Sequence, residues 1–304
     1  MGSLPGQRTA FSAVLAQSSG QHMGGSSRTK QRRQEGRRRD RTGSGVPEAD
    51  LSRRHWTFPA RSRRTRLKRC LHDRLEWLIC RASLHGDLPV FHADRFGWIT
   101  QVEREWQGVR EELEMVLQHR EAMPNFQQIL PQVGKIQKDD QWKTFFLKGV
   151  GMDCRENARR CPRTMQLLAT IPGCSTAFFS ILSPHKHIPP HRGAWAGVLR
   201  LHLALIVPEP REQCRIRIAD QIHTWEEGRC LVFDDTYNHQ VWNDTDGYRV
   251  VLFVDFARPL RWPVSVLNNW ILNLAALAPF LREANQNQQA AERSFWRRFS
   301  GPPS

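Results

Sequence analysis

Five short apolar segments between residues 177 and 256 decide the fold of this chain. They read AFFSIL (177–182), GVLRLHLALIV (197–207), CRIRIA (214–219), GRCLVF (228–233) and YRVVLFVDF (248–256). Each segment is rich in Val, Ile, Leu or Phe, and turn residues such as Pro208-Glu209-Pro210 separate the segments. Short strands at this spacing are typical of a compact β-sandwich or barrel. The sequence therefore predicts a mainly β core.

Amphipathic helices are predicted before these strands. Leu71, Leu75, Leu78 and Ile79 fall on one helical face, and from Trp98 to Leu117, before Pro124, apolar side chains recur every three or four positions with Glu and Arg between them. This periodicity is typical of helices that bury one face. A strand-like run follows at 141–150, and another helix is predicted at 155–170. We therefore expect helices to flank the β core.

A last helix is predicted after Pro259. Its apolar face is formed by Leu267, Trp270, Ile271, Leu274, Leu277, Ala278 and Leu281. Asn268, Asn269 and Asn273 lie off this face, which disfavours a membrane-spanning helix. We expect the apolar face to pack on the domain, and docking on a membrane surface is the alternative.

The positive charge of the chain is concentrated at its N-terminus. The 304 residues include 45 Lys or Arg and 30 Asp or Glu, a net charge of +15. Residues 1–70 hold seventeen of the basic residues and four of the acidic ones, so the rest carries only +2. We expect 1–69 to be a disordered basic extension, 70–262 to be the folded domain with its β core at about 175–258, and 263–304 to be the C-terminal helix and tail.

The basic extension has two interpretations. It is either an arm for RNA, DNA or anionic lipid, or a solvated extension translated from an early start codon. The nearly neutral domain argues against nucleic acid as its partner. Seven cysteines without a CxxC pair, and residues 1–30 without an apolar signal segment, predict a cytoplasmic protein. Peripheral contact with a membrane is compatible with this location.

Two histidines are the candidate metal ligands. His191 follows Pro189-Pro190, and His239 follows the strand that ends at Phe233. Side chains at strand ends meet at the mouth of a small barrel, and imidazole nitrogens bind Fe(II), Zn or Cu. Two histidines usually need a carboxylate to complete such a site. The alternative is that both are ordinary surface or core residues.

Two arginines interrupt apolar strands. Arg200 lies in LRLHL, on the same strand face as His202, and Arg249 lies in YRVVL. An inward arginine is costly without an anion, so the two cations indicate a dicarboxylate ligand bound by paired hydrogen bonds. The alternative is pairing within the protein, for which the candidate carboxylates are Asp220, Asp234, Asp235 and Asp255.

These motifs, taken together, resemble the aspartyl/asparaginyl β-hydroxylase family. The matching segments are IPPHRG (188–193), RLHLALIVP (200–208), TWEEG (224–228), FDD (233–235), HQVWN (239–243) and Arg249. The resemblance extends over about 95–260 and is densest at 178–256. It implies an Fe(II)- and 2-oxoglutarate-dependent dioxygenase on a double-stranded β-helix, the jelly-roll or cupin-like fold.

The resemblance also implies a role for individual residues. His191 and His239 would bind the iron, while Arg249, with Ser180 as a hydroxyl partner, would bind the distal carboxylate of 2-oxoglutarate. Arg200 and His202 would lie near its 1-carboxylate end.

Gly193 stands where most relatives of this superfamily place a carboxylate ligand. This departure matches the family's own two-histidine pattern, in which water completes the coordination. Asp234 and Asp235 are candidates for supporting the ligands, and a simple strand-end role is the alternative for both.

The implied reaction hydroxylates an unactivated C–H bond with O₂ and converts 2-oxoglutarate to succinate and CO₂. The primary expectation for the substrate is the β-carbon of an Asp or Asn residue in a peptide or protein. The alternative is a lipid acyl chain at a membrane surface. A more distant alternative is a non-catalytic β-helix binding protein with a nucleic-acid-binding arm.

Overall fold

The computed structural model describes residues 63–136, 138–275 and 277–299. The predicted disordered extension therefore lies mostly outside the described residues. The first described helix, α2 (Arg63–Ala82), begins before the predicted boundary at residue 70. Leu67 precedes Leu71 by four positions and extends the apolar spacing of the helix into the Arg-rich segment.

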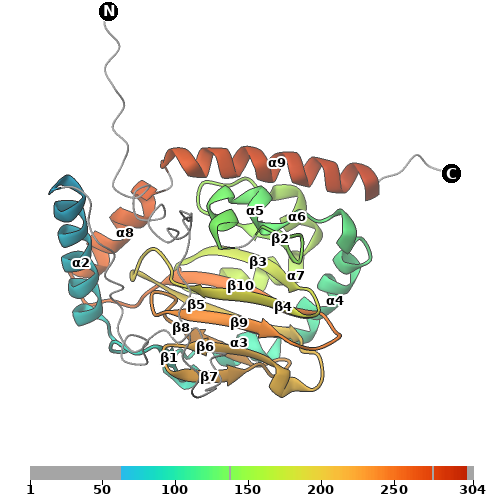
Figure 1. Cartoon of the computed structure of the whole chain (residues 1–304), viewed down its shortest axis with the longest axis horizontal. Coiled ribbons are helices and arrows are strands. Elements are labelled where there is room, and N and C mark those ends of the chain that lie inside the picture. Colours follow the sequence, from blue (N-terminus) through green and yellow to red (C-terminus); the bar gives the residue numbers. More distant parts are fainter. Residues whose placement is uncertain (1–62, 137, 276, 300–304) are drawn as a thin grey trace, which may run out of the picture.

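Two antiparallel sheets form the centre of the molecule (Figure 1). The larger sheet has the strand order β1-β8-β5-β10-β3-β2, and the smaller has the order β4-β9-β6-β7. The strands are β1 (Val90–Phe91), β2 (Trp142–Lys148), β3 (Cys174–Leu182), β4 (Lys186–His191), β5 (Val198–Ile206), β6 (Cys214–Ile218), β7 (Gln221–Thr224), β8 (Cys230–Phe233), β9 (His239–Asn243) and β10 (Arg249–Ala257). The sheets face each other across a shared apolar core, so the predicted double-stranded β-helix is confirmed.

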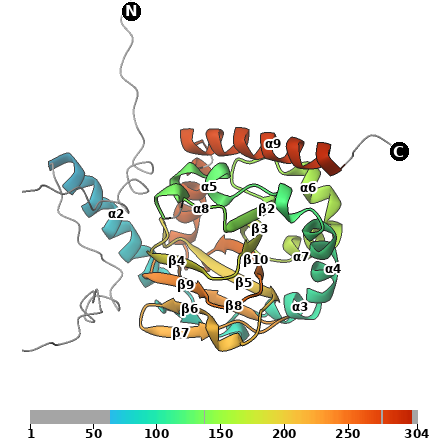
Figure 2. The same ribbon diagram turned by 45° about the vertical axis from the view of Figure 1, so that its right-hand side comes forward.

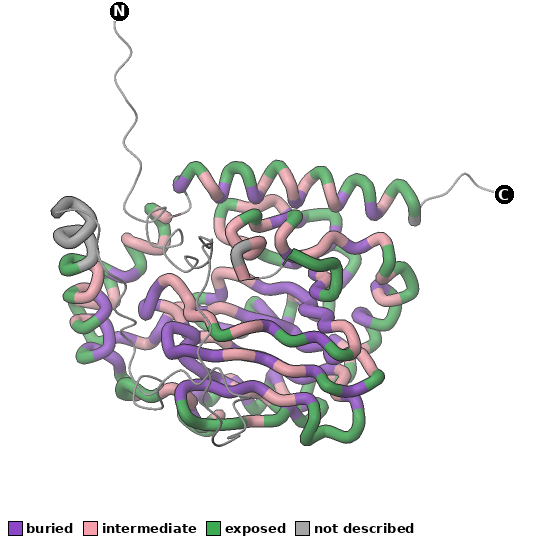
Figure 3. The backbone as a smooth tube through the Cα atoms, viewed as in Figure 1, coloured by how far each residue is buried: buried purple, intermediate pink, exposed green. Residues whose placement is uncertain are grey.

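Helices surround the larger sheet on its outer side and edges (Figure 2). They are α3 (Ile99–Arg104), α4 (Trp106–Leu117), α5 (Phe126–Ile129), α6 (Arg155–Arg160), α7 (Pro162–Ala169), α8 (Val264–Ala275) and α9 (Pro279–Phe299). Leu199, Leu201 and Leu203 of β5 belong to the core beneath the helices. Figure 3 shows α9 with exposed residues on its outer side and buried residues toward the domain.

Strand alternation assigns the functional residues to the other face of the larger sheet. On β5, Arg200 and His202 point away from the leucine core. His202 lies opposite Phe253 of β10, and Ser180 of β3 lies opposite Val251, two positions along β10 from Arg249. These side chains therefore point between the two sheets.

The predicted C-terminal helix differs from the structure in two ways. It is divided into α8 and α9, because Pro279 begins a new helix. The expected packing holds for Ile271, Ala278 and Leu281 but is wrong for Trp270 and Leu274 of α8 and for Leu277 after it, which are exposed. Asn268 is buried instead. Asn268 accepts a hydrogen bond from Trp195 Nε1 and donates one to the Gly197 carbonyl, at 2.9 and 2.8 Å. These two bonds fix the rotation of α8.

Within the described residues, no single helix is long and apolar enough to cross a membrane. Helices α8 and α9 reach that length and composition only as a pair, and they are bent by 59° at the break between them.

Candidate active site

The two predicted metal ligands lie side by side on neighbouring strands. His191 ends β4, His239 begins β9, and the two residues are directly paired across the strands. Their ring centroids are 4.1 Å apart. The local sequence explains this position, because Pro189-Pro190 confines β4 to the edge of the sheet and His191 to its end.

Backbone carbonyls fix the tautomer of both rings. His191 Nδ1 lies 2.8 Å from the carbonyl oxygen of Pro189, and His239 Nδ1 lies 2.9 Å from that of Tyr237. A carbonyl oxygen only accepts, so each Nδ1 carries the proton and donates it. Each Nε2 keeps its lone pair for a metal.

Desolvation keeps these rings neutral. It lowers the pKa of His191 to about 4 and that of His239 well below its ordinary value. The positive charge of Arg200 acts in the same direction on both. A neutral imidazole is the form that binds a metal, so the pair is prepared for binding at neutral pH.

The side chain of Asp235 lies against Gly193. A Cβ added to Gly193 would stand 2.0 Å from Asp235 Oδ2, and the Gly193 amide donates to the Asp235 carbonyl at 2.6 Å. Asp235 is 4% exposed, and burial raises its pKa to about 7 although Arg200 acts in the opposite direction. A carboxylate from the turn before β9 therefore occupies the space that a side chain at position 193 would need.

Arg200 is paired within the protein. Its guanidinium bonds to Asp255 at 2.9 and 3.2 Å, and its Nη2 lies 2.8 Å from Asp235 Oδ2. The pairing alternative considered for the arginines therefore applies to Arg200. With both carboxylates already bound, Arg200 serves to hold Asp235 in place and is not an unpaired cation for a ligand.

Arg249 is different, because it is buried without such a partner. It is 2% exposed, and its guanidinium carbon lies 4.8 Å from the centre of the Trp225 ring. Its Nε and Nη1 atoms lack hydrogen-bond partners among the described residues, and burial lowers its pKa to about 10. A buried, unpaired cation is strongly unfavourable, so the site is suited to an anionic ligand.

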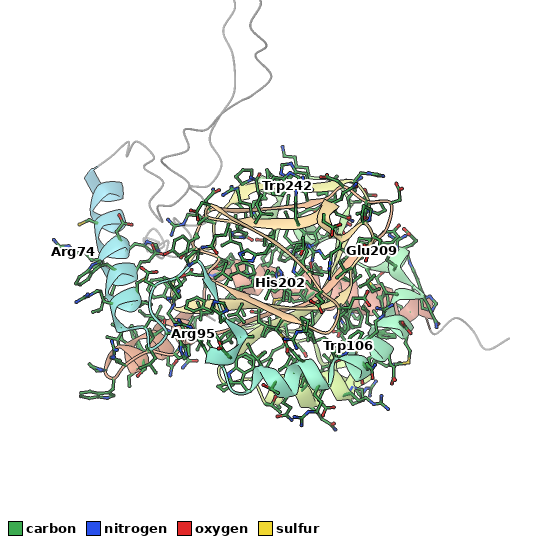
Figure 4. The ribbon with its side chains drawn as sticks, turned by 90° about the horizontal axis from the view of Figure 1, so that it is seen from below. Arg74, Arg95, Trp106, His202, Glu209 and Trp242 are labelled. Atoms are coloured by element: carbon green, nitrogen blue, oxygen red, sulfur yellow. The ribbon has the colours of Figure 1, made fainter. Side chains whose placement is uncertain are left out.

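Further unpaired polar atoms surround Arg249. Both ring nitrogens of His202 and the Nε1 of Trp225 lack partners within the described part of the chain. His202 lies in the middle of the domain (Figure 4), where burial and the charges of Arg249 and Arg200 lower its pKa. Ser180 accepts a hydrogen bond from Trp142 Nε1 at 2.9 Å, which leaves its hydroxyl proton available for donation.

A buried ion pair supports the turn that leads to His239. Arg258 and Asp234 are both fully buried and bonded to each other. Asp234 also accepts hydrogen bonds from the amide and hydroxyl of Thr236, at 3.0 and 2.5 Å. Asp234 was a sequence candidate for supporting the ligands. Arg258 was missed, and its sequence signal is an arginine directly after an apolar strand.

Three tryptophans of the β core, Trp195, Trp225 and Trp242, lie in different places. Trp225 belongs to the interior beside Arg249. Trp195 bonds to Asn268 of α8, and Trp242 stacks on His187 with ring centroids 5.3 Å apart. Only Trp225 of these three contacts the candidate ligand-binding residues.

The closeness of Gly193 and Asp235 leads to a prediction. The substitution Gly193→Ala pushes the Asp235 carboxylate away from Arg200, and we expect it to lower stability by about 1–3 kcal/mol, the usual cost of overpacking. Urea unfolding measures this change. Gly134→Ala is the control, because its added Cβ meets its nearest neighbour at an ordinary 3.8 Å.

A double-mutant cycle assigns the cause. In the Asp235→Ala background, Gly193→Ala should cost much less, because the clashing carboxylate is gone. An equal cost in both backgrounds would show that Asp235 is not what excludes a side chain from position 193.

Comparison with known proteins matches this region to one family. The model of the aspartyl/asparaginyl beta-hydroxylase family matches residues 103–259. The ornithine lipid ester-linked acyl 2-hydroxylase of Rhizobium tropici is 46% identical over 211 residues, which are 69% of this chain and 75% of that protein.

Two further likenesses are more distant. The aspartyl/asparaginyl beta-hydroxylase of Mus musculus is 32% identical over 54% of this chain, and the match spans only 22% of that relative's length. A prolyl-4-hydroxylase structure from Pseudomonas putida matches with a TM-score of 0.35 and 19% identity, over 50% of this chain and 87% of that one. The family model and the Rhizobium relative establish that the chain belongs to the aspartyl/asparaginyl beta-hydroxylase family.

Proposed function

We propose that this chain is an Fe(II)- and 2-oxoglutarate-dependent dioxygenase that hydroxylates an unactivated C–H bond. The observation that carries the proposal is the neutral His191–His239 pair together with the buried Arg249 guanidinium. The donor set fits Fe(II), because two imidazoles leave coordination positions open for further ligands. The unpaired guanidinium fits a carboxylate of the cosubstrate.

Each residue has a distinct part in this function. His191 and His239 hold the iron through Nε2. Arg249 pairs with the distal carboxylate of 2-oxoglutarate, and Ser180 donates its hydroxyl proton to the same group. The aromatic side chains of Trp225, Phe233 and Phe253 belong to the apolar interior and exclude water.

When bound, iron and 2-oxoglutarate supply the oxidising chemistry. One oxygen atom of O₂ enters succinate, formed with CO₂ from 2-oxoglutarate, and the other enters the substrate, where C–H becomes C–OH. The protein orients the cosubstrate and substrate, and it keeps water out of the site.

Asp235 supports the metal site without joining the ligand set. Among the described residues, His72, Asp73 and Glu76 bring three potential ligand atoms within 4.8 Å of one another. Asp235 does not form such a cluster with His191 and His239. We assign to Asp235, whose carboxylate fills the space at Gly193, the role of a hydrogen-bond acceptor that would support the metal site. Arg200 holds it for this purpose.

For the substrate, we favour the acyl chain of a lipid over the Asp or Asn side chain ranked first by the sequence. The support is the 46% identity to a lipid acyl 2-hydroxylase over most of both chains. The second candidate is the β-carbon of an Asp or Asn residue in a peptide, supported by the shorter match to the mouse enzyme.

The test begins with anaerobic binding of Fe(II) and 2-oxoglutarate, followed optically, and continues with admission of O₂. We expect succinate release to match product formation with an ornithine-type lipid, and only uncoupled release with Asp- or Asn-containing peptides. Coupled turnover of a peptide alone would transfer the function to the second candidate. Failure to bind either Fe(II) or 2-oxoglutarate would refute the dioxygenase itself.

A further inference from the structure

An exposed apolar surface extends over α2 and α8. We define this α2–α8 surface by the large apolar residues that the two helices and their ends expose. They include Leu71 (60% exposed), Trp77 (63%), Trp262 (80%), Val266 (58%), Trp270 (62%), Leu274 (50%) and Leu277 (64%). Within α8, Val266, Trp270 and Leu274 recur every four residues and so form one stripe along the helix, while Trp262 precedes it and Leu277 follows it. The two helices pack on each other through the apolar cluster around Ile79, and several large apolar residues exposed on such a pair indicate an interaction site.

The structure holds this stripe outward. The opposite side of α8 carries Asn268, which is 1% exposed and bonds to Trp195 Nε1 and to the Gly197 carbonyl. Rotating the helix to bury Trp270 would break both bonds and expose their partners. The outward direction of the apolar stripe is therefore a built feature of the fold.

The charge around this surface selects its partner. Arg74 and Arg81 of α2 and Arg261 before α8 are exposed, and Figure 4 shows Arg74 on α2 at the edge of the molecule, away from the domain. The sequence from Phe256 to Arg282 contains no Asp or Glu. Tryptophans beside arginines around an apolar stripe suit the interface of an anionic bilayer. A second copy of the same surface would bring like charges together.

Both helices are attached to the segment that follows the first metal ligand. Glu76 of α2 accepts hydrogen bonds from Arg192 at 3.1 and 3.2 Å, and the Nε2 of His72 lies 3.3 Å from the Ala194 carbonyl oxygen. Asn268 of α8 bonds to Gly197 in the same segment. The α2–α8 surface is therefore connected through residues 192–197 to His191.

From these observations we propose that the α2–α8 surface docks on an anionic bilayer and brings the active site to its lipid substrate. This inference rests on the proposed function, because it explains how a buried site meets an acyl chain. The tryptophans enter the headgroup region, the stripe of α8 contacts the upper acyl chains, and the arginines pair with anionic headgroups.

Sedimentation with vesicles tests the docking. The full chain is mixed with vesicles of phosphatidylcholine alone or of phosphatidylcholine with phosphatidylglycerol. The variant Trp262→Glu/Trp270→Glu is compared with Met115→Glu/Ile222→Glu, whose residues are 51% and 62% exposed on α4 and β7. We expect the tryptophan variant to lose binding to anionic vesicles about a hundredfold, since each buried aromatic side chain contributes about tenfold or more, and the control to bind like the wild type.

Two further variants keep the result interpretable. Trp262→Ser/Trp270→Ser removes the apolar area without adding charge and should also bind weakly. Arg74→Glu/Arg81→Glu should weaken binding to anionic vesicles and leave the weak binding to phosphatidylcholine unchanged. Circular dichroism melting confirms that each variant is folded.

The outcomes separate docking from catalysis. Wild-type binding to neither vesicle, or undiminished binding by both tryptophan variants, would overturn the proposal. So would a dimer that the tryptophan substitutions abolish while vesicle binding is absent. Coupled turnover of a short-chain, monomeric lipid reports the proposed function separately, and we expect the tryptophan variants to retain it. Vesicle binding without any lipid turnover would leave the docking intact and refute the substrate assignment.

Discussion

The double variant His191→Ala/His239→Ala is expected to release no succinate above the level of a protein-free control. It loses both proposed imidazole ligands at once, and the proposed site needs them to bind Fe(II). The expected loss is more than about a thousandfold in rate, equivalent to about 4 kcal/mol in the barrier. The measurement is O₂-dependent succinate formation with Fe(II), 2-oxoglutarate and lipid. Each single variant retains one imidazole and should need a higher Fe(II) concentration.

His187→Ala is the matched control for this experiment. His187 lies on β4 like His191, but it is exposed and stacks on Trp242. Its loss should leave turnover close to that of the wild type. Normal turnover by the double variant would mean that these histidines do not hold the metal.

The variant Arg249→Met is expected to bind 2-oxoglutarate about tenfold to a hundredfold more weakly. This is the loss expected when a hydrogen bond to a charged group is removed. The cause is the loss of the guanidinium that, in the proposed function, pairs with the distal carboxylate of 2-oxoglutarate. At the same time, the cosubstrate-free protein should be at least as stable as the wild type, because the substitution removes an unpaired buried cation. Anaerobic titration measures the affinity, and urea unfolding without 2-oxoglutarate measures the stability.

Arg258→Met provides the contrasting case. Its guanidinium is equally buried, but it is paired with Asp234, so its removal leaves a buried carboxylate without its cation. We expect a loss of about 3–5 kcal/mol in the free energy of unfolding. If Arg249→Met is destabilised to the same degree, Arg249 is a structural residue and the cosubstrate must bind elsewhere.

The core strands were predictable because their composition alone carries the signal. Strands β3, β5, β6, β8 and β10 coincide with the five apolar segments, and β2 with the run at 141–150. The remaining strands are short, polar or interrupted. β1 has two residues, β4 contains Pro189-Pro190, β7 reads QIHT, and β9 carries His239. Neighbouring strands, and not local preference, hold these residues extended.

The residues of the candidate site could be predicted only where a sequence motif marks them. His191 and His239 follow from their positions near strand ends and from the family pattern, and the structure pairs them. Periodicity did not distinguish Arg200 from Arg249, because both interrupt apolar strands. The difference depends on Asp255, which the register of β5 and β10 places opposite Arg200. Long-range partners of this kind become visible only in the fold.

The Arg258–Asp234 pair also bears on whether folding would depend on the proposed metal. The turn before His239 is fixed by this ion pair and by Thr236, and none of these three residues is among the proposed metal ligands. Metal binding is therefore not needed to fold the turn, in contrast to small zinc domains that are unfolded without their ion. Under the proposed function, a cell short of iron would therefore hold folded, inactive protein that regains activity when iron returns, without new synthesis.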